Sequence, residues 1–252
     1  MIDAVFPELE ALQSFEDISL REMDEVRLMN RTDTKFVLSR YLLNELFSEL
    51  SGAYRVLDVM GSRISRYKTL YFDTAGLNFY LDHHNGRLSR YKVRIRNYVE
   101  SDLHFLEIKH KYKGRTVKKR IKIDDFELAL KPLSVNYINE VVGKEMSLQS
   151  KLWNSFGRIT LVNKTEKERL TIDLNLSFEW RDETKSFEEV VVAELKQENV
   201  NRNSSFYSLM KKHNIRPTGM SKYCLGTFTM DPTVKWNNFK PKVLLINKLE
   251  RA

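Results

Sequence analysis

The sequence predicts an α+β protein organised around an antiparallel β-barrel of about eight to nine strands, closed on itself, with helices packed outside. Three observations support this. Nine short segments have the β-branched and aromatic content of strands, and most of them alternate apolar with ionic residues. Amphipathic helical segments separate groups of these strands. If such helices cover the apolar face of the barrel, its ionic face lines a tunnel.

The chain is interpreted as one tunnel domain over residues 27–228, preceded by an N-terminal helical segment, residues 1–26, that packs on the barrel. A tail, residues 229–252, has no assigned role. The 252 residues contain no internal repeat and no linker rich in Pro, Gly or Ser. This length is compatible with one large domain.

The strands follow from composition and alternation. They are residues 31–39, 54–60, 64–73, 88–98, 103–112, 116–123, 158–162, 169–178 and 189–196. The second and third are expected to form a hairpin around Gly61-Ser62. The fourth to sixth have tight connections, including a Lys113-Gly114 turn, and predict an antiparallel meander.

The helices follow from apolar spacing and caps. Residues 7–28 predict one or two short helices with a break near residues 17–19, and Ser39 caps a helix that Gly52 ends. The pair Asp73-Thr74 caps a short helix through Tyr80.

The second half of the chain adds three helical regions. Residues 124–153 change period and predict a helical insertion broken at Pro132. Ser204 and Ser221 each cap one further helix.

Charged residues recur on one face of strand after strand, because side chains of a strand point alternately to its two sides. The ionic faces carry Arg90, Lys92, Arg94 and Arg96; Glu107, Lys109 and Lys111; Lys118, Arg120 and Lys122; Arg169 and Asp173; and Glu194 and Lys196. One interpretation is a half-exposed sheet that turns this face to water. The other is a wet tunnel that binds a polyanion, which the helices between the strands favour.

Three carboxylates lie among these cations, at Glu107, Asp173 and Glu194. Oxygen ligands of this kind suit Mg²⁺ or Mn²⁺, which would link them to phosphate oxygens. Ion pairing with neighbouring Lys and Arg is the equal alternative, and spacing alone leaves both open.

Composition limits the function classes. The formal net charge of +8 indicates an acidic partner, which charge alone does not identify as nucleic acid, anionic lipid or phosphorylated small molecule. The single cysteine, Cys224, excludes a disulfide framework and a cysteine-based zinc site. Neither a signal peptide nor an apolar stretch of about 20 residues occurs, so we expect a cytoplasmic protein. The sequence also lacks a Walker loop, a dinucleotide fingerprint and a nucleophile elbow.

Seven short motifs occur in the order typical of VTC domains, which the chain resembles over residues 27–228. They are Arg31-x-Asp-x-Lys35, Leu70-Tyr-Phe-Asp-Thr74, Arg90-x-Lys-x-Arg-x-Arg-x-Tyr98, Leu106-Glu-Ile-Lys109, Arg169-Leu-Thr-Ile-Asp173, Glu194-Leu-Lys196 and Ser221-Lys-Tyr223. VTC domains are polyphosphate polymerases of the CYTH-like triphosphate tunnel metalloenzyme superfamily.

The resemblance implies a basic β-tunnel that binds the triphosphate of ATP and a growing phosphate chain, with Mn²⁺ or Mg²⁺ held by a glutamate. The catalytic cations would be Arg94, Arg96, Lys109, Arg158 and Lys222. Substrate or phosphate would be bound by Lys35, Arg90, Lys92, Lys111, Lys118, Arg120, Arg169, Lys196 and Ser221. The metal ligand would be Glu194, with Glu107 and Asp173 as further candidates.

Three positions depart from the family pattern. Asp33 stands where the first-strand motif commonly has Glu, and Phe156 stands where the family has the Tyr of a Tyr-x-Arg motif. Some members also have a Lys just before the Ser-Lys pair, where this chain has Gly219-Met220. We therefore expect tunnel chemistry that is weaker or differently tuned.

The expected activity is transfer of the ATP γ-phosphate to a polyphosphate chain. The alternatives are a metal-dependent triphosphatase acting on inorganic triphosphate or a nucleotide, and a non-catalytic polyphosphate- or RNA-binding module. The expected partners are ATP and polyphosphate or triphosphate rather than nucleic acid, and a membrane-protein partner for the product stays open.

Overall fold

The computed structural model describes residues 8–25 and 31–251. The rest of the predicted N-terminal segment, including Val26, lies outside the described residues. The strands are β1 (Glu16–Ser19), β2 (Thr32–Ser39), β3 (Tyr54–Asp58), β4 (Ser65–Asp73), β5 (Ser89–Tyr98), β6 (Leu103–Tyr112), β7 (Arg115–Ile123), β8 (Gln149–Asn163), β9 (Glu168–Trp180), β10 (Glu183–Phe187) and β11 (Val190–Gln197). The α-helices are α1 (Glu8–Leu12), α2 (Leu20–Glu25), α3 (Leu43–Leu50), α4 (Asn78–His84), α5 (Pro132–Val142), α6 (Ser205–Lys212), α7 (Lys222–Met230) and α8 (Lys240–Leu249).

One curled sheet holds all the strands. Its main path of eight strands runs β2-β11-β9-β8-β4-β5-β6-β7, and every pairing along it is antiparallel. Strand β10 pairs antiparallel with the end of β9, and β3 pairs with β8 and, in parallel, with β1. The antiparallel α+β class and the β5–β6–β7 meander are confirmed.

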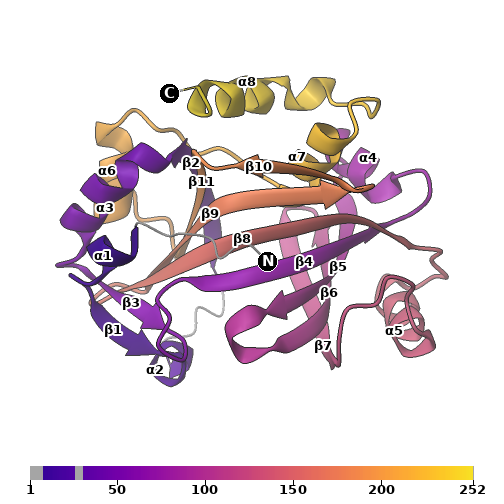
Figure 1. The fold of residues 1–252 in the computed structure, drawn as a ribbon, viewed down its shortest axis with the longest axis horizontal. Coiled ribbons are helices and arrows are strands. Elements are labelled where there is room, and N and C mark those ends of the chain that lie inside the picture. The colour runs from indigo at the N-terminus through magenta and orange to yellow at the C-terminus, as the bar shows by residue number, and fades with distance from the viewer. Residues whose placement is uncertain (1–7, 26–30, 252) are drawn as a thin grey trace.

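The expectation of a closed barrel is wrong. The ends of the path, β2 and β7, do not pair within the described residues, so the sheet is an open half-barrel (Figure 1). Strand β7 is exposed along most of its length and carries Lys119 on the face opposite Lys118 and Arg120. A strand with cations on both faces would lose their hydration if it became an interior strand, and charged edges of this kind resist further pairing.

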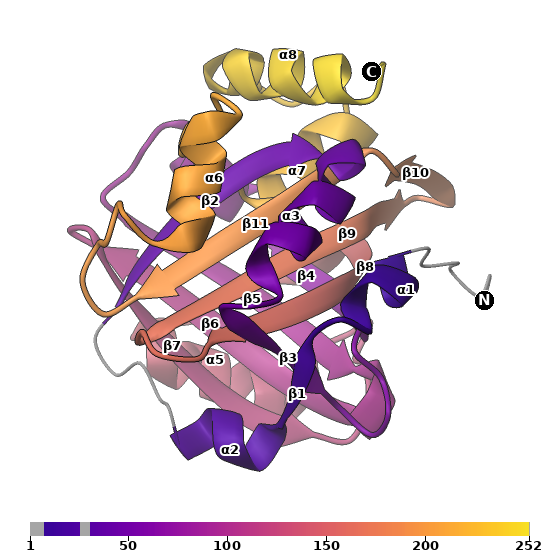
Figure 2. The ribbon, with the colours of Figure 1, turned by 90° about the vertical axis from the view of Figure 1, so that its left-hand side faces the viewer.

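Helices cover the convex face of the sheet, as predicted. On one side α3 and α6 pack over β2, β11 and β9, through side chains such as Phe36, Leu195 and Phe206 (Figure 2). On the other side, α5 packs behind β5 and β6, where its residue Ile138 shares a core cluster with Ile108 of β6. The face with the opposite side-chain parity, which carries Arg94 and Glu194, is called the concave face below.

Helix α7 does not follow the prediction that the helices pack outside the barrel. Its residues Tyr223 and Cys224 pack against Val37, Tyr71 and Val192, which share the concave face with the ionic residues of their strands. Helix α8, from the tail, packs beyond α7 at the same end of the sheet (Figure 1). The concave face is therefore covered by apolar side chains at this end and is ionic elsewhere.

Close packing of α7 is possible because residue 226 is glycine. A Cβ there would lie 2.4 Å from the Phe178 ring and 2.5 Å from a Leu152 methyl group. We expect Gly226→Ala to lower the free energy of unfolding by about 1–3 kcal/mol, as overpacked cores do. Urea denaturation measures this, with Gly219→Ala as the control, because no atom lies within 4 Å of that Cβ. Equal stability of the two variants would contradict the tight contact.

Several local predictions need correction. Strands β3 and β4 form no hairpin with each other; both pair with β8, one after the other along the edge of β8 that lies opposite β9. The predicted insertion 124–153 is helical only in α5, since β8 already begins at Gln149. Helix α4 begins one turn later than expected, at Asn78. The capping roles of Ser204 and Ser221 are confirmed, since their hydroxyls accept the Tyr207 and Cys224 N–H groups.

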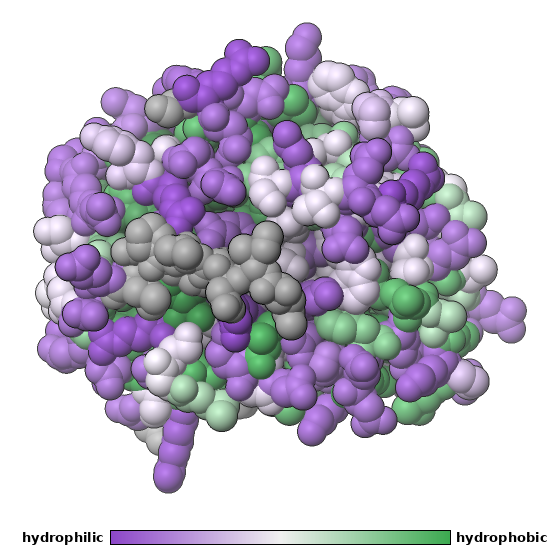
Figure 3. All heavy atoms as spheres, viewed as in Figure 1, coloured by the Kyte–Doolittle hydropathy of each residue, from purple (hydrophilic) through white to green (hydrophobic). Residues whose placement is uncertain are grey.

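The N-terminal segment has the two expected short helices, α1 and α2, but the break between them forms strand β1. Within the described ranges, no helix combines the length and apolar character that crossing a bilayer requires. On the face seen in Figure 3, hydrophilic side chains predominate and hydrophobic ones form small separate groups.

Candidate phosphate-binding site

Strand register brings the ionic residues of the concave face together in pairs. Arg94 lies opposite Glu107 on β5 and β6, Arg158 lies opposite Asp173 on β8 and β9, and Lys35 lies opposite Glu194 on β2 and β11. Each predicted carboxylate therefore faces a cation on a neighbouring strand.

Glu107 is the most buried of the three carboxylates. Its Oε2 accepts Arg94 Nε at 2.8 Å and Nη2 at 2.6 Å, and its Oε1 accepts the Lys118 ammonium. Burial raises the pKa of Glu107, but the charges of Arg94, Arg96 and Lys118 lower it well below its ordinary value. The carboxylate is thus ionised and fully paired.

Asp173 is held in the same way. Its Oδ1 accepts Arg158 Nε at 2.5 Å and its Oδ2 accepts Arg158 Nη2 at 2.8 Å, while Lys222 from α7 donates to Oδ2. Burial raises the pKa of Asp173, and Arg158 and Lys222 outweigh burial and lower it. Asp173 is the point at which α7 joins the ionic part of the site.

Glu194 lies between two lysines. Lys35 Nζ is 2.9 Å from its Oε1 and Lys196 Nζ is 2.9 Å from its Oε2. Burial raises the pKa of Glu194, but the two ammonium groups lower it well below its ordinary value. Glu194 is the most exposed of the three carboxylates, at 15% of its side chain against 1% for Glu107 and 4% for Asp173.

A stacked aromatic pair forms the centre of the site, which sequence reasoning missed. The rings of Tyr67 and Phe156 are 5.1 Å apart and nearly parallel. Arg96 and Arg158 lie over both rings at 5.0–5.6 Å, and Lys222 lies 4.5 Å from the Phe156 ring. These contacts orient three cations toward one region. Alternation was an available signal, because Tyr67 shares its face with Thr69 and Tyr71.

Three cations of the site have no carboxylate partner among the described residues: Lys92, Arg96 and Lys109. Arg96 is 6% exposed and donates from Nε to Thr69 Oγ1 at 3.3 Å. Burial and then the Arg94 charge lower the pKa of Arg96. Burying cations without acidic partners costs free energy, so this arrangement favours an anionic ligand.

The lysines of the site share depressed pKa values. Burial, followed by repulsion from Arg94, lowers the pKa of Lys109 to about 7. Burial is also the main cause of pKa values of about 8 for Lys92, Lys118, Lys196 and Lys222. These lysines are poised to gain protons when an anion binds.

We expect stability to rise with pH above neutrality. Between about pH 7 and 10 the folded protein releases the Lys109 proton, whereas the unfolded chain, with an ordinary lysine pKa of 10.5, retains it. The unfolded state then binds more protons, so the free energy of unfolding increases with pH, by at least about 1 kcal/mol from pH 7 to 9. Urea denaturation at pH 7, 8 and 9 tests this. Lys109→Met should reduce the slope, and a flat or falling curve for the natural chain would contradict the pKa values.

The remaining predicted ligands lie toward the edges of the site. Arg90 donates from Nη1 to the Arg87 carbonyl oxygen at 2.9 Å, and Lys111 is its register partner on β6. Arg120 lies on the exposed strand β7, with its guanidinium 4.4 Å from the Phe105 ring. Arg169 lies opposite Lys196 on β11. The Ser221 hydroxyl already caps α7.

The donor set allows a divalent metal only in combination with a phosphate. No three His, Cys, Asp or Glu side chains converge anywhere in the described ranges, so the protein supplies no complete metal cage there. Mg²⁺ bound with phosphate substrates needs only one or two carboxylates. Glu194 fits this requirement, since it is partly exposed and bonded only by lysines. Glu107 and Asp173 are each bound by an arginine through close hydrogen bonds and fit it less well.

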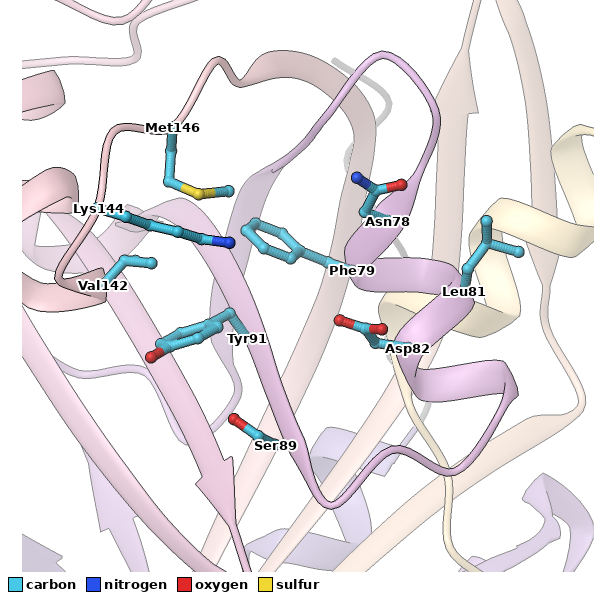
Figure 4. A pocket seen from close by; sticks show the side chains of 9 residues that line it. All are labelled: Asn78, Phe79, Leu81, Asp82, Ser89, Tyr91, Val142, Lys144 and Met146. Atoms are coloured by element: carbon cyan, nitrogen blue, oxygen red, sulfur yellow. The ribbon is translucent and has the colours of Figure 1, made fainter.

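A cavity of about 350 Å³ lies on the other side of β5, away from the cations. It is lined by residues of α4, the start of β5 and the segment after α5, among them Phe79, Asp82, Tyr91 and Lys144 (Figure 4). Tyr91 has the parity opposite to Arg90 and Lys92. This cavity is therefore separated from the phosphate-binding site by the strand itself.

The protein thus combines a curled antiparallel sheet with a cationic concave face, whose charge suits an anionic ligand. The chain belongs to the VTC domain family, whose sequence model matches residues 30–230. None of the curated proteins compared with the chain matches it.

Two solved structures are among those similar to the chain. A proposed adenylyl cyclase from Hippeastrum, described as having a dominant triphosphatase activity, aligns with a TM-score of 0.50 and 16% identity over 79% of this chain and 95% of that one. A proposed adenylate cyclase from Bacillus halodurans aligns with a TM-score of 0.48 and 13% identity over 77% and 96%. At these identities the similarity concerns the fold alone.

Proposed function

We propose that this protein is a polyphosphate polymerase that transfers the γ-phosphate of ATP to the end of a polyphosphate chain and releases ADP. The observation that carries the proposal is the imbalance of charge on the concave face. Among the described residues, the ionic cluster there sets nine cations, Lys35, Lys92, Arg94, Arg96, Lys109, Lys118, Arg158, Lys196 and Lys222, against the three carboxylates Glu107, Asp173 and Glu194. A chain with one negative charge or more per phosphate balances this excess along its length.

Phosphoryl transfer depends on positioning and charge stabilisation more than on a protein nucleophile. In this proposal Arg94, Arg96, Lys109, Arg158 and Lys222 hold the reacting phosphates and stabilise the charge that develops on them. The rest of the phosphate chain is guided by the lysines around Glu194 and by more peripheral cations, including Arg90, Lys111, Arg120 and Arg169. Glu194 would hold Mg²⁺ or Mn²⁺, which supplies charge neutralisation at the phosphate oxygens when bound.

The chemistry of the acceptor favours polymerisation over hydrolysis. The terminal oxygen of a phosphate chain is already an anion near neutral pH and needs no general base. Water does need one, and the three carboxylates are poor bases, since each has a lowered pKa and paired oxygens.

The second candidate function is a metal-dependent triphosphatase. It would use the neutral amine of Lys109, which a pKa of about 7 populates in the ligand-free protein, to accept a proton from water. The triphosphatase activity described for the Hippeastrum protein is consistent with hydrolysis on this fold.

Incubation with ATP and Mn²⁺, followed by gel separation of the products, distinguishes these functions. A ladder of phosphate chains with ADP supports the polymerase. Free phosphate without a ladder supports the triphosphatase. Unchanged ATP, together with tight binding of polyphosphate or RNA, would overturn both and leave a binding module.

A further inference from the structure

A buried carboxylate outside the ionic cluster joins two helices at the apolar end of the concave face. Asp73, the last residue of β4, is completely buried. Its Oδ1 accepts the N–H groups of Thr74 at 2.7 Å and Phe79 at 2.9 Å, and its Oδ2 accepts that of Tyr80 at 2.9 Å. Asp73 therefore fixes the first turn of α4 to the end of β4.

A further contact of this carboxylate reaches across the molecule to α7. The Tyr223 hydroxyl donates to Asp73 Oδ2 at 2.5 Å, although the two residues are 150 positions apart. Tyr223 is 2% exposed and follows Lys222 directly in the first turn of α7. The hydrogen bond thus sets the position of the turn from which Lys222 extends to Asp173.

A second contact leads from Tyr223 to β5. The Tyr223 ring lies 5.1 Å from the ring of Tyr71, and Arg94 Nη1 donates to the Tyr71 hydroxyl oxygen at 3.3 Å. Asp73, Tyr223 and Tyr71 are in this way connected to Lys222 on one side and Arg94 on the other.

We propose that Asp73 and Tyr223 are positioning residues, which fix α7 against the sheet so that Lys222 and Arg94 converge on the bound phosphate. The inference rests on the proposed function, because it takes a triphosphate as the ligand. Neither residue is placed to touch the phosphate itself, because both are buried at the apolar end of the concave face. Their effect on binding passes through the two cations.

Tyr223→Phe tests this by removing one hydroxyl while keeping the ring. We expect faster amide hydrogen exchange in α7 and roughly tenfold weaker binding of inorganic tripolyphosphate, since a buried hydrogen bond to a charged group is lost. The matched control is Tyr54→Phe, which removes another buried tyrosine–carboxylate hydrogen bond, to Glu168, in the core of the convex face. It should leave α7 exchange and tripolyphosphate affinity unchanged.

A double-mutant cycle separates positioning from general destabilisation. In a Lys222→Met background, Tyr223→Phe should weaken tripolyphosphate binding much less than in the natural chain, because one of the two cations that it positions is gone. Equal effects in both backgrounds, or α7 exchange that matches the natural chain, would overturn the proposal. Failure of the natural chain to bind tripolyphosphate would instead overturn the proposed function, and hydrogen exchange would still decide whether Tyr223 fixes α7.

Discussion

Replacing Arg96 with methionine is expected to weaken tripolyphosphate binding by roughly 100-fold, because a buried charge-assisted contact to phosphate is lost. Arg96 combines burial, aromatic contacts on Tyr67 and Phe156, and the lack of a carboxylate partner among the described residues. No carboxylate is hydrogen-bonded to it in the described residues, whereas Arg94 and Arg158 are already paired with Glu107 and Asp173.

The same substitution should leave the fold intact or stabilise it. Methionine retains much of the apolar volume and removes a buried cation that Arg94 repels. Isothermal titration calorimetry with tripolyphosphate and thermal denaturation measure the two effects. The control is Arg66→Met, since Arg66 has the opposite parity on β4 and pairs with Glu100 at 3.0 Å. Loss of affinity in both variants, or in neither, would contradict the role given to Arg96.

Glu194→Gln is expected to have opposite effects on turnover and on metal-free binding. Loss of the proposed metal ligand should reduce turnover of ATP with Mn²⁺ by about 100-fold or more. In the presence of a chelator, tripolyphosphate should bind more tightly than to the natural chain, because Lys35 and Lys196 lose their acidic partner and are free for phosphate.

Glu107→Gln provides the matched control. It also releases two cations, Arg94 and Lys118, but leaves the proposed metal ligand in place. Its turnover should still rise with Mn²⁺ concentration. If Glu194→Gln retained metal-dependent turnover and Glu107→Gln lost it, the metal ligand would be Glu107 instead.

The sequence by itself determined the character of the concave face. Alternation along a strand is a local property, so Lys92, Arg94 and Arg96 could be placed on one side, with Val93 and Ile95 on the other, before any pairing was known. Other local signals, the short connections and the cap residues, predicted the meander β5–β6–β7 and the capping serines. The resemblance to VTC domains then selected Arg158 and Lys222, which alternation alone would not have chosen. The domain division at residues 26 and 228, and the roles of all site residues, stay predictions.

Only the tertiary structure decided which charged side chains pair with one another and where the ionic part of the concave face gives way to the apolar part. The Lys222–Asp173 and Tyr223–Asp73 contacts join residues 49 and 150 positions apart, and they depend on how α7 packs on the sheet. The absence of pairing between β2 and β7 in the described chain likewise reflects the cost of enclosing an edge strand with cations on both faces. Local patterning specifies which face of each strand is ionic, while long-range packing determines which of its cations are neutralised and which remain available to bind phosphate.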